Sequence, residues 1–184
     1  MAAMRRRVFF LLRPGEYCRG GTDTAQHPFR IKDVKLIIVQ QPYKAAKLSN
    51  SVLAQADYVS FLFTTQNNGI KSKSIGHGCT VHHQGCPLAA MHRQVAYLRR
   101  HGATSKTPLS IFNKATKWQQ IRGDDITAAI RVVAQAAGPE IGFTDVEISA
   151  RFLQGGGAMA FFVAQVDPDT IRLVGRWRSD TMLH

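Results

Sequence analysis

The sequence predicts an α+β fold that is mostly helical and contains one small antiparallel sheet. Two segments, 34–39 and 58–65, are rich in β-branched and aromatic residues, and an Asn-Gly pair follows the second. Several further stretches carry apolar residues at helical spacing. Because 184 residues with 45% hydrophobic content can bury a real core, we expect residues 1–184 to form a single domain.

The first predicted element is the end of a buried helix at residues 8–12, Val-Phe-Phe-Leu-Leu. Proline disfavours helical geometry in the residue before it, so Arg13-Pro14-Gly15 is expected to stop this helix. The chain is therefore expected to begin inside a helix.

Strands are predicted next, at 34–39 and 58–65. Alternation on the second strand places three apolar side chains on one face. These are Val59, Phe61 and Phe63. Asn68-Gly69 then precedes a further polar and β-branched run, and both central positions of a tight hairpin turn require positive φ, which Asn and Gly tolerate. We predict a hairpin over 58–75.

A helix is predicted at 87–100, and Gly102 is its expected left-handed stop. Its inner face is expected to carry Leu88, Met91, Val95 and Leu98. Its outer face is expected to carry Arg93, Arg99 and Arg100.

Three more helices are predicted in the C-terminal third. Asp124-Asp125 can cap a helix that runs to residue 137, and another is expected within 147–166 despite three consecutive glycines. Asp167-Pro168 supplies an N-cap and a first-turn proline for a short helix ending before Gly175. The expected inner face of the first of these helices comprises Ile126, Ala129, Ile130, Val133 and Ala137.

The charge of the chain points to a polyanionic partner. Lys and Arg number 24 against 12 Asp and Glu, a formal net charge of +12. Residues 1–123 hold 19 basic and 4 acidic side chains, whereas 124–184 hold 5 and 8. An excess of positive charge raises affinity for nucleic acid, so we expect a basic, DNA-binding surface in the N-terminal two thirds.

Other composition features exclude several classes of protein. Three cysteines give an odd count without framework spacing, which favours a reducing, intracellular compartment over a disulfide-stapled secreted fold. The five-residue apolar run at 8–12 is shorter than the roughly 7–15 residues of a signal peptide. No run approaches the roughly 20 apolar residues of a membrane span, so no membrane association is expected.

Cys79, His82, His83 and Cys86 could form a zinc site. All four lie within eight residues, however, and structural zinc sites usually join separated segments through a second ligand pair. We expect an exposed polar loop and no metal or other cofactor, with a small zinc-binding interaction domain as an alternative.

Two segments resemble a known family. Leu11-Leu12-Arg13-Pro14-Gly15-Glu16 is similar to the "GLR-x-x-E" signature of tyrosine recombinases, and residues 148–177 are similar to that family's "H-x-L-R-H … I-x-x-L-G-H" stretch. The predicted hairpin lies where the family places its own. The match covers about residues 11–184 and resembles integrase-like proteins of eukaryotic mobile elements. It implies the catalytic domain of the family, without the family's N-terminal DNA-clamping domain.

The resemblance implies a role for each matched position. Arg13 and Glu16 correspond to the first phosphate-binding arginine and its accompanying acid, and Gln154 stands at the second arginine. The remaining catalytic positions of the family are occupied here by Arg151, Arg176 and Trp177. DNA contacts are implied for Asn67, which stands at the position of the hairpin lysine, and for Lys71, Lys73, Arg172 and Arg178.

The family's chemistry explains these residue types. A tyrosine attacks a DNA phosphodiester, and the strand is rejoined without a metal or nucleotide cofactor, while two arginines stabilise charge on the phosphate. Gln154 brings no charge, and the attacking tyrosine is expected beyond His184, so we expect impaired DNA recombination or integration. The alternative is a non-catalytic basic DNA-binding module. The resemblance also implies a homo-oligomer on DNA and, in a eukaryote, a nuclear location.

Simpler roles remain open for the same side chains. Arg13 could be only a cation near a helix end, and Lys71 and Lys73 could be charges that protect an edge strand from aggregation. Trp177 could be a core aromatic, and Arg176 a solvated residue at the end of a helix.

Overall fold

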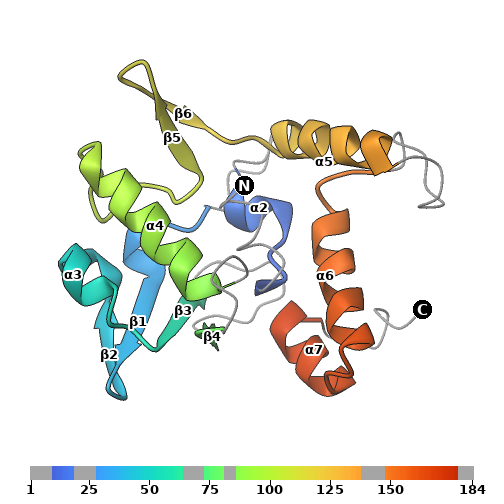
Figure 1. Cartoon of the computed structure of the whole chain (residues 1–184), viewed down its shortest axis with the longest axis horizontal. Helices are drawn as coiled ribbons and strands as arrows, with labels where there is room; N and C mark the ends of the chain where they lie inside the picture. Colours follow the sequence, from blue (N-terminus) through green and yellow to red (C-terminus); the bar gives the residue numbers. More distant parts are fainter. Residues whose placement is uncertain (1–9, 19–27, 64–72, 81–85, 138–147, 178–184) are drawn as a thin grey trace.

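The computed structural model describes residues 10–18, 28–63, 73–80, 86–137 and 148–177. It is an α+β structure in which a four-stranded antiparallel sheet, a separate two-stranded hairpin and several helices surround one buried cluster (Figure 1). None of the helices in these ranges combines the length and apolarity that a membrane span requires.

The sheet has the strand order β2-β1-β3-β4, and every pairing is antiparallel. Its strands are β1 (Val34–Ile38), β2 (Gln41–Lys44), β3 (Tyr58–Phe63) and β4 (Lys73–Gly78). The strands predicted at 34–39 and 58–65 are confirmed, and the predicted inner face of β3 is buried. Alternation identified this face correctly because side chains on one face of a strand share the same environment. On the opposite face of β3, Tyr58 and Leu62 are only half-buried.

The pairing of β3 with β4 confirms a hairpin, but its second strand lies later than expected. Phe63 pairs with Lys73 and Tyr58 pairs with Gly78, so β4 runs to residue 78 instead of 75. The predicted Asn-Gly turn lies outside the described residues.

Three strands were not predicted, and their turns explain why. Val39 and Gln40 link β1 to β2 with φ of 47° and 63°. Ala115 and Thr116 link β5 (Ile111–Lys114) to β6 (Lys117–Gln120) with φ of 47° and 66°. Two consecutive positive φ values are the backbone of a tight hairpin turn, which usually carries Asn or Gly. Neither pair has that sequence signature.

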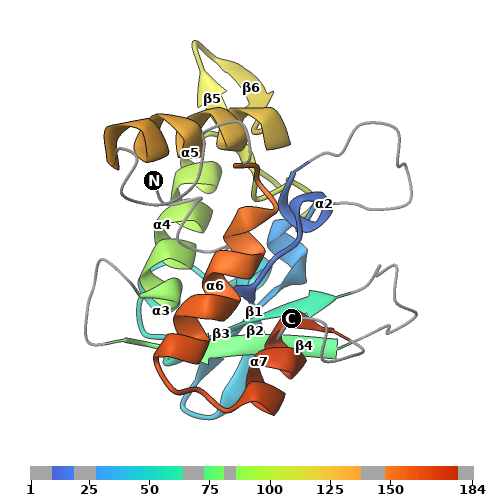
Figure 2. The ribbon, with the colours of Figure 1, turned by 90° about the vertical axis from the view of Figure 1, so that its right-hand side faces the viewer.

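Helix α4 (Pro87–Arg100) matches its predicted bounds, and Gly102 has a φ of 81° just beyond its end. The four apolar side chains expected on its inner face are buried, and α4 packs on β3 and β4 (Figure 2). Arg93 and Arg100 are exposed as expected.

The prediction for Arg99 on the outer side of α4 is wrong. Its guanidinium is half-buried and donates to the carbonyl oxygen of Leu48 at 2.5 Å and to Asn50 Oδ1 at 3.2 Å. These acceptors lie next to the short helix η2 (Ala45–Lys47) and in α3 (Asn50–Leu53). Burial lowers the pKa of Arg99. The hydrogen bonds of Arg99 therefore hold residues 45–53 against α4.

The C-terminal helices are α5 (Gly123–Ala137), α6 (Phe152–Val163) and α7 (Pro168–Gly175), close to their predicted positions. Asp167 caps α7 by accepting a hydrogen bond from the Thr170 N–H at 2.8 Å. The predicted inner face of α5 is largely wrong, because only Ile126 is buried and Val133 is 63% exposed. Ala129 and Ala137 are exposed as well, and Ile130 is half-buried.

Of the helix predicted at 8–12, residues 8 and 9 lie outside the described residues, Phe10 is helical, and Leu11 and Leu12 are not. Phe10 is helical and buried, but Leu11 already has a φ of 44°. A new short helix, α2 (Pro14–Tyr17), begins at the proline that was expected to end the first. Proline fits there because the first helical position needs no N–H donor.

Candidate functional site

Arg13 and Glu16 are held together by the start of α2. Arg13 is the N-cap residue, and its backbone N–H donates to Glu16 Oε2 at 2.7 Å. The Glu16 N–H in turn donates to the Arg13 carbonyl at 2.9 Å. The Arg-x-x-Glu spacing thus places the acid at the third helical position, where a carboxylate can reach back to the cap.

Arg176 joins this pair from the other end of the described chain. It follows α7 in a left-handed conformation, with φ of 59°, and its Nη2 lies 2.6 Å from Glu16 Oε2. Its guanidinium also donates to the carbonyl oxygens of Phe10, Leu11 and Val174. The Phe63 ring lies under it, with 4.1 Å between the ring centroid and Cζ. The residue is 4% exposed.

The two charges are buried together, and burial sets the direction of both pKa shifts. Desolvation raises the pKa of Glu16 above its ordinary value of 4.5, although Arg176 and Arg13 oppose the rise. Desolvation also lowers the pKa of Arg176, and Glu16 opposes that change. A buried pair of this kind is costly to break, because the remaining partner loses its compensation.

Arg13 and Gln154 reach the end of α7 beside the ion pair. Arg13 Nη2 lies 3.5 Å from the Arg176 carbonyl oxygen, and Gln154 Nε2 lies 3.5 Å from the Gly175 carbonyl oxygen. Both side chains are half-buried. The structure therefore brings together four of the predicted site residues from three separate segments. We call Arg13, Glu16, Gln154 and Arg176 the arginine cluster.

Trp177 packs over the end of α7. A methyl group added to Gly175 would lie 1.6 Å from the Trp177 ring, so glycine is required for the ring to sit there. Trp177 is half-buried, so the structure gives it a packing role at the end of α7.

The other predicted residues lie apart from these hydrogen bonds or cannot be placed. Arg151 is exposed at the N-cap of α6, and Arg172 forms an ion pair with Asp169 at 2.9 Å on α7. Lys73 begins β4, opposite Phe63. Asn67, Lys71 and Arg178 lie outside the described residues.

The geometry limits what the arginine cluster can bind. An arginine has five N–H donors, and the hydrogen bonds of Arg176 Nη1 and Nη2 all run to protein acceptors. This guanidinium therefore connects the C-terminal end of the described chain to its N-terminal segment through hydrogen bonds. Arg13 is the more accessible cation of the two.

Further exposed basic residues lie on α4, on the β5–β6 hairpin, which projects from the molecule (Figure 1), and in the connection between them. We call them the α4–hairpin surface: Arg93 and Arg100 on α4, Lys106 in the connection, and Lys114 and Lys117 in the hairpin. Lys114 and Lys117 are directly opposite each other in the hairpin, an arrangement of like charges that costs stability until an anion screens it. The sequence indicated Arg93 and Arg100 through helical spacing, whereas the hairpin lysines gave no signal.

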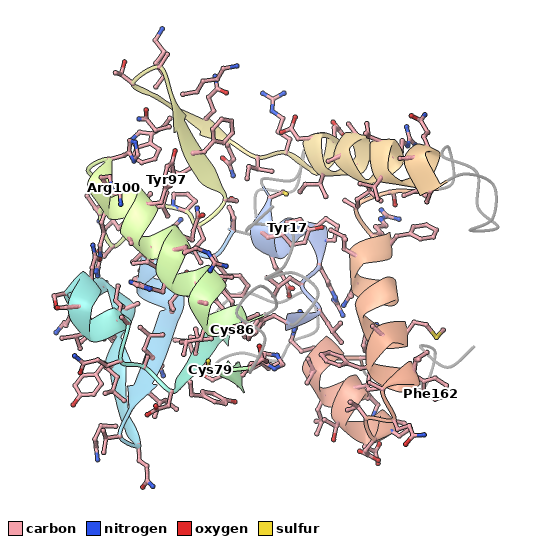
Figure 3. All side chains as sticks on the ribbon, viewed as in Figure 1. Tyr17, Cys79, Cys86, Tyr97, Arg100 and Phe162 are labelled. Atoms are coloured by element: carbon pink, nitrogen blue, oxygen red, sulfur yellow. The ribbon has the colours of Figure 1, made fainter. Side chains whose placement is uncertain are left out.

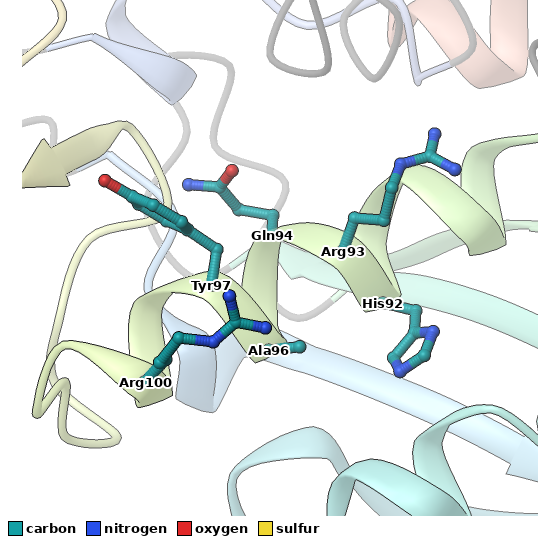
Figure 4. A pocket seen from close by; sticks show the side chains of 6 residues that line it. All are labelled: His92, Arg93, Gln94, Ala96, Tyr97 and Arg100. Atoms are coloured by element: carbon teal, nitrogen blue, oxygen red, sulfur yellow. The ribbon is translucent and has the colours of Figure 1, made fainter.

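Side-chain hydrogen bonds fix the hairpin against α4. Gln94 Nε2 donates to the Leu109 carbonyl at 2.8 Å, and the Tyr97 hydroxyl accepts from the Asn113 N–H at 2.9 Å. Gln94 and Tyr97 also line a groove of about 500 Å³ along α4, together with basic side chains of the same helix (Figure 4). Its lining comprises His92, Arg93, Gln94, Ala96, Tyr97 and Arg100.

The zinc alternative involves residues that are only partly described. Cys79 and Cys86 can be placed, but His82 and His83 cannot. Among the described residues, no group of three or more metal-ligating side chains occurs.

Comparison with known proteins returns no match: no family model, curated protein or solved structure is similar to this chain. Any functional assignment therefore depends on the residues and their geometry.

Proposed function

We propose that this chain is a DNA-binding domain derived from the catalytic domain of a tyrosine recombinase, and that it holds DNA phosphates without cutting the strand. The observation that carries the proposal is the arginine cluster. Its members were matched to the family from sequence motifs near the two ends of the chain. A chance match of two short motifs would not require their residues to meet, yet Glu16 and Arg176 are 2.6 Å apart.

The order of elements between the two motifs also supports the proposal. An antiparallel β3–β4 pair lies between Arg13 and the C-terminal helices, as the family's lysine-bearing hairpin does. Asn67 stands at the position of that lysine, and Lys71 and Lys73 are the basic residues that could replace it; of the three, only Lys73, the first residue of β4, is within the described residues.

Strand cleavage is not expected, because the cluster offers too little charge to a phosphate. Gln154 donates hydrogen bonds but carries no charge, and Arg176 is buried with its Nη donors directed to protein oxygens. Removing one preorganised donor from an active site typically lowers the rate about 10²–10³-fold, and members of one constellation depend on each other. Tyr17, next to Glu16, is buried, and its hydroxyl donates to the Ala150 carbonyl.

DNA binding without cleavage needs only accessible positive charge. The α4–hairpin surface provides it, and its arginines and lysines can neutralise phosphates and release counterions. Arg13 can add a phosphate contact next to the cluster. Affinity from such contacts is independent of sequence, so we expect little preference among duplexes of equal length.

The experiment is incubation of the purified chain with a duplex that carries a nick near a scissile phosphate, so that a cleaved strand cannot be rejoined. We expect a DNA complex under native conditions and no covalent adduct after denaturation. A denaturant-resistant protein–DNA adduct would overturn the inactive part of the proposal. Failure to bind DNA at low salt would overturn the proposal that the chain binds DNA.

A matched variant sharpens this experiment. Gln154→Arg restores the charge that the family has at this position, on a side chain that is already next to Gly175. Because Arg176 stays committed to Glu16, we expect Q154R to bind DNA more tightly and still to form no adduct. An adduct formed by Q154R alone would show that one lost charge, and not the buried Arg176, prevents cleavage.

A further inference from the structure

Cys79 and Cys86 approach each other at the junction of β4 and α4. Cys79 follows the last residue of β4, and Cys86 is the N-cap residue of α4. Their Sγ atoms are 3.3 Å apart (Figure 3). The two thiols differ sharply in accessibility, since Cys79 is exposed and Cys86 is 1% exposed.

The start of a long helix surrounds the buried thiol. Cys86 Sγ accepts a hydrogen bond from the Ala89 N–H at 3.5 Å, and α4 continues for 14 residues beyond it. Burial opposes ionisation of Cys86, but hydrogen bonds from Ala89, Thr80 and Cys79 outweigh it and lower its pKa. A thiol at a helix N-terminus is a typical place for a stabilised thiolate. The pKa of Cys79 is raised, chiefly by its hydrogen bond with Cys86.

We propose that Cys79 and Cys86 are a redox-modification site that closes into an intramolecular disulfide on reaction with a small disulfide of the glutathione class. This inference is independent of DNA binding. It depends on the short distance between the sulfurs, on the exposure of one and on the position of the other at the helix start.

The exchange takes place in two balanced steps. Cys79, as thiolate, attacks one sulfur of the small disulfide, whose S–S bond breaks and releases one small thiolate. Cys86, as thiolate, then attacks Cys79 Sγ, and the second small thiolate leaves. The two cysteine protons pass through solvent to the two leaving thiolates. Two protein thiols are oxidised, and one small disulfide is reduced to two thiols.

Accessibility, and not acidity, sets the order of attack, because the thiol of Cys86, which has the lower pKa, is buried and Cys79 is exposed. A bulky disulfide can reach the exposed Cys79 but not the buried Cys86. Once Cys79 carries the mixed disulfide, Cys86 needs to move only from 3.3 Å to the disulfide bond length of about 2.05 Å. Because β4 and α4 already pack on each other, no rearrangement of these elements is needed. Cys18 is buried in a different part of the chain, just after α2.

The test is treatment of the reduced full chain with oxidised glutathione, followed by intact mass measurement and peptide mapping without reductant. For the natural chain we expect loss of two hydrogen atoms and a crosslinked peptide that contains Cys79 and Cys86. For Cys86→Ser we expect a stable glutathione adduct on Cys79, because the resolving thiol is absent. For Cys79→Ser we expect neither product.

Cys18→Ala is the matched control, and it should give the same crosslink as the natural chain. The proposal is overturned if the natural chain accumulates a glutathione adduct without closing the disulfide. It is also overturned if the natural chain does not react or if the crosslink includes Cys18. Because these outcomes are read on the natural chain, a variant that fails to fold does not affect them.

Discussion

Two regions of the molecule differ in how they bury their apolar residues. The first is the four-stranded sheet with α4, and the second comprises α5, α6 and α7. In the first region, Phe61, Phe63 and Leu98 are almost fully buried, and Phe61 and Phe63 pack against the Phe29 ring. In the second region, many large apolar side chains are exposed. They are Val132, Val133, Phe152, Met159, Phe162, Val163 and Leu173. The first region therefore carries the core of the molecule, and the second depends on a few specific contacts with it.

Those contacts are concentrated near α2. Tyr17 donates its hydroxyl to the Ala150 carbonyl at 3.2 Å, and Arg176 donates to Glu16, Phe10 and Leu11. The two regions also differ in charge, because α4 and its hairpin carry the exposed residues Arg93, Arg100, Lys114 and Lys117, whereas α5, α6 and α7 begin with acidic side chains or carry few basic ones. Arg176 therefore joins the C-terminal helices to the segment around α2, and the DNA contacts that we propose lie on the other region.

The largest expected effect comes from removing this attachment. Arg176→Met leaves Glu16 buried without its partner, so we expect the free energy of unfolding to fall by about 3–5 kcal/mol, measured by urea denaturation. Arg172→Met is the control, because the Arg172–Asp169 pair is much more exposed than the Arg176–Glu16 pair, and it should cost at most about 1 kcal/mol. Equal losses in the two variants would mean that Arg176 does not hold the regions together.

A pair of methionines tests the difference in burial directly. Met91 on α4 is 1% exposed, and Met159 on α6 is 60% exposed. We expect Met91→Ala to lower the free energy of unfolding by about 2–5 kcal/mol, because it leaves a cavity. Met159→Ala should change it by less than about 0.5 kcal/mol. A large loss in M159A would instead indicate that α6 is covered in solution.

Two glycines separate a packing requirement from simple helix propensity. Gly175→Ala would drive a methyl group into the Trp177 ring, and we expect a cost of about 1–3 kcal/mol by thermal or urea unfolding. Nothing lies within 4 Å of a methyl group at Gly156 in α6, so Gly156→Ala should stabilise the chain by up to about 1 kcal/mol. If both variants gained stability, Trp177 would not be packed over Gly175.

The smallest effect is the pH dependence that Glu16 contributes. Because burial raises the pKa of Glu16 in the folded chain, the native state binds its proton more tightly than the unfolded state does. Its contribution to stability is therefore complete below the ordinary pKa of 4.5 and is lost as pH rises through the folded pKa. We expect the stability of the natural chain relative to Glu16→Gln to fall as the pH rises above the ordinary pKa of 4.5. A rise over this range would mean that Arg176 outweighs burial and lowers the pKa.

Much of the fold could be predicted where local sequence and tertiary packing agree. Helix α4 has apolar residues at helical spacing, a first-turn proline and a glycine beyond its end, and its predicted bounds are correct. The β1–β2 and β5–β6 hairpins could not be predicted, because Val39-Gln40 and Ala115-Thr116 adopt positive φ without the residues that favour it. The inner face of α5 was wrong because spacing identifies an apolar face but not whether anything covers it.

The sequence motifs selected four residues that lie close together, but they did not indicate what each side chain does, and Arg151 lies apart from them. The motifs placed Arg13, Glu16, Gln154 and Arg176 in one site, and they do meet. The interpretation of Arg176 as a solvated residue at a helix end is wrong, because its guanidinium is buried against Glu16. No local pattern could reveal this, since the two residues are 160 positions apart. The lysines of the β5–β6 hairpin were missed because the hairpin itself was missed.

The most direct test of DNA binding through phosphates is the salt dependence of affinity for a short duplex. Each neutralised phosphate contributes about −0.9 to the slope of log K against log salt, so several contacts predict a steep fall. The paired variant Lys114→Ala/Lys117→Ala should reduce the slope by about 2. Lys44→Ala/Lys47→Ala, with the same change in charge at β2 and η2, should leave it unchanged. A slope near zero, or equal losses in the two pairs, would contradict DNA binding at the α4–hairpin surface.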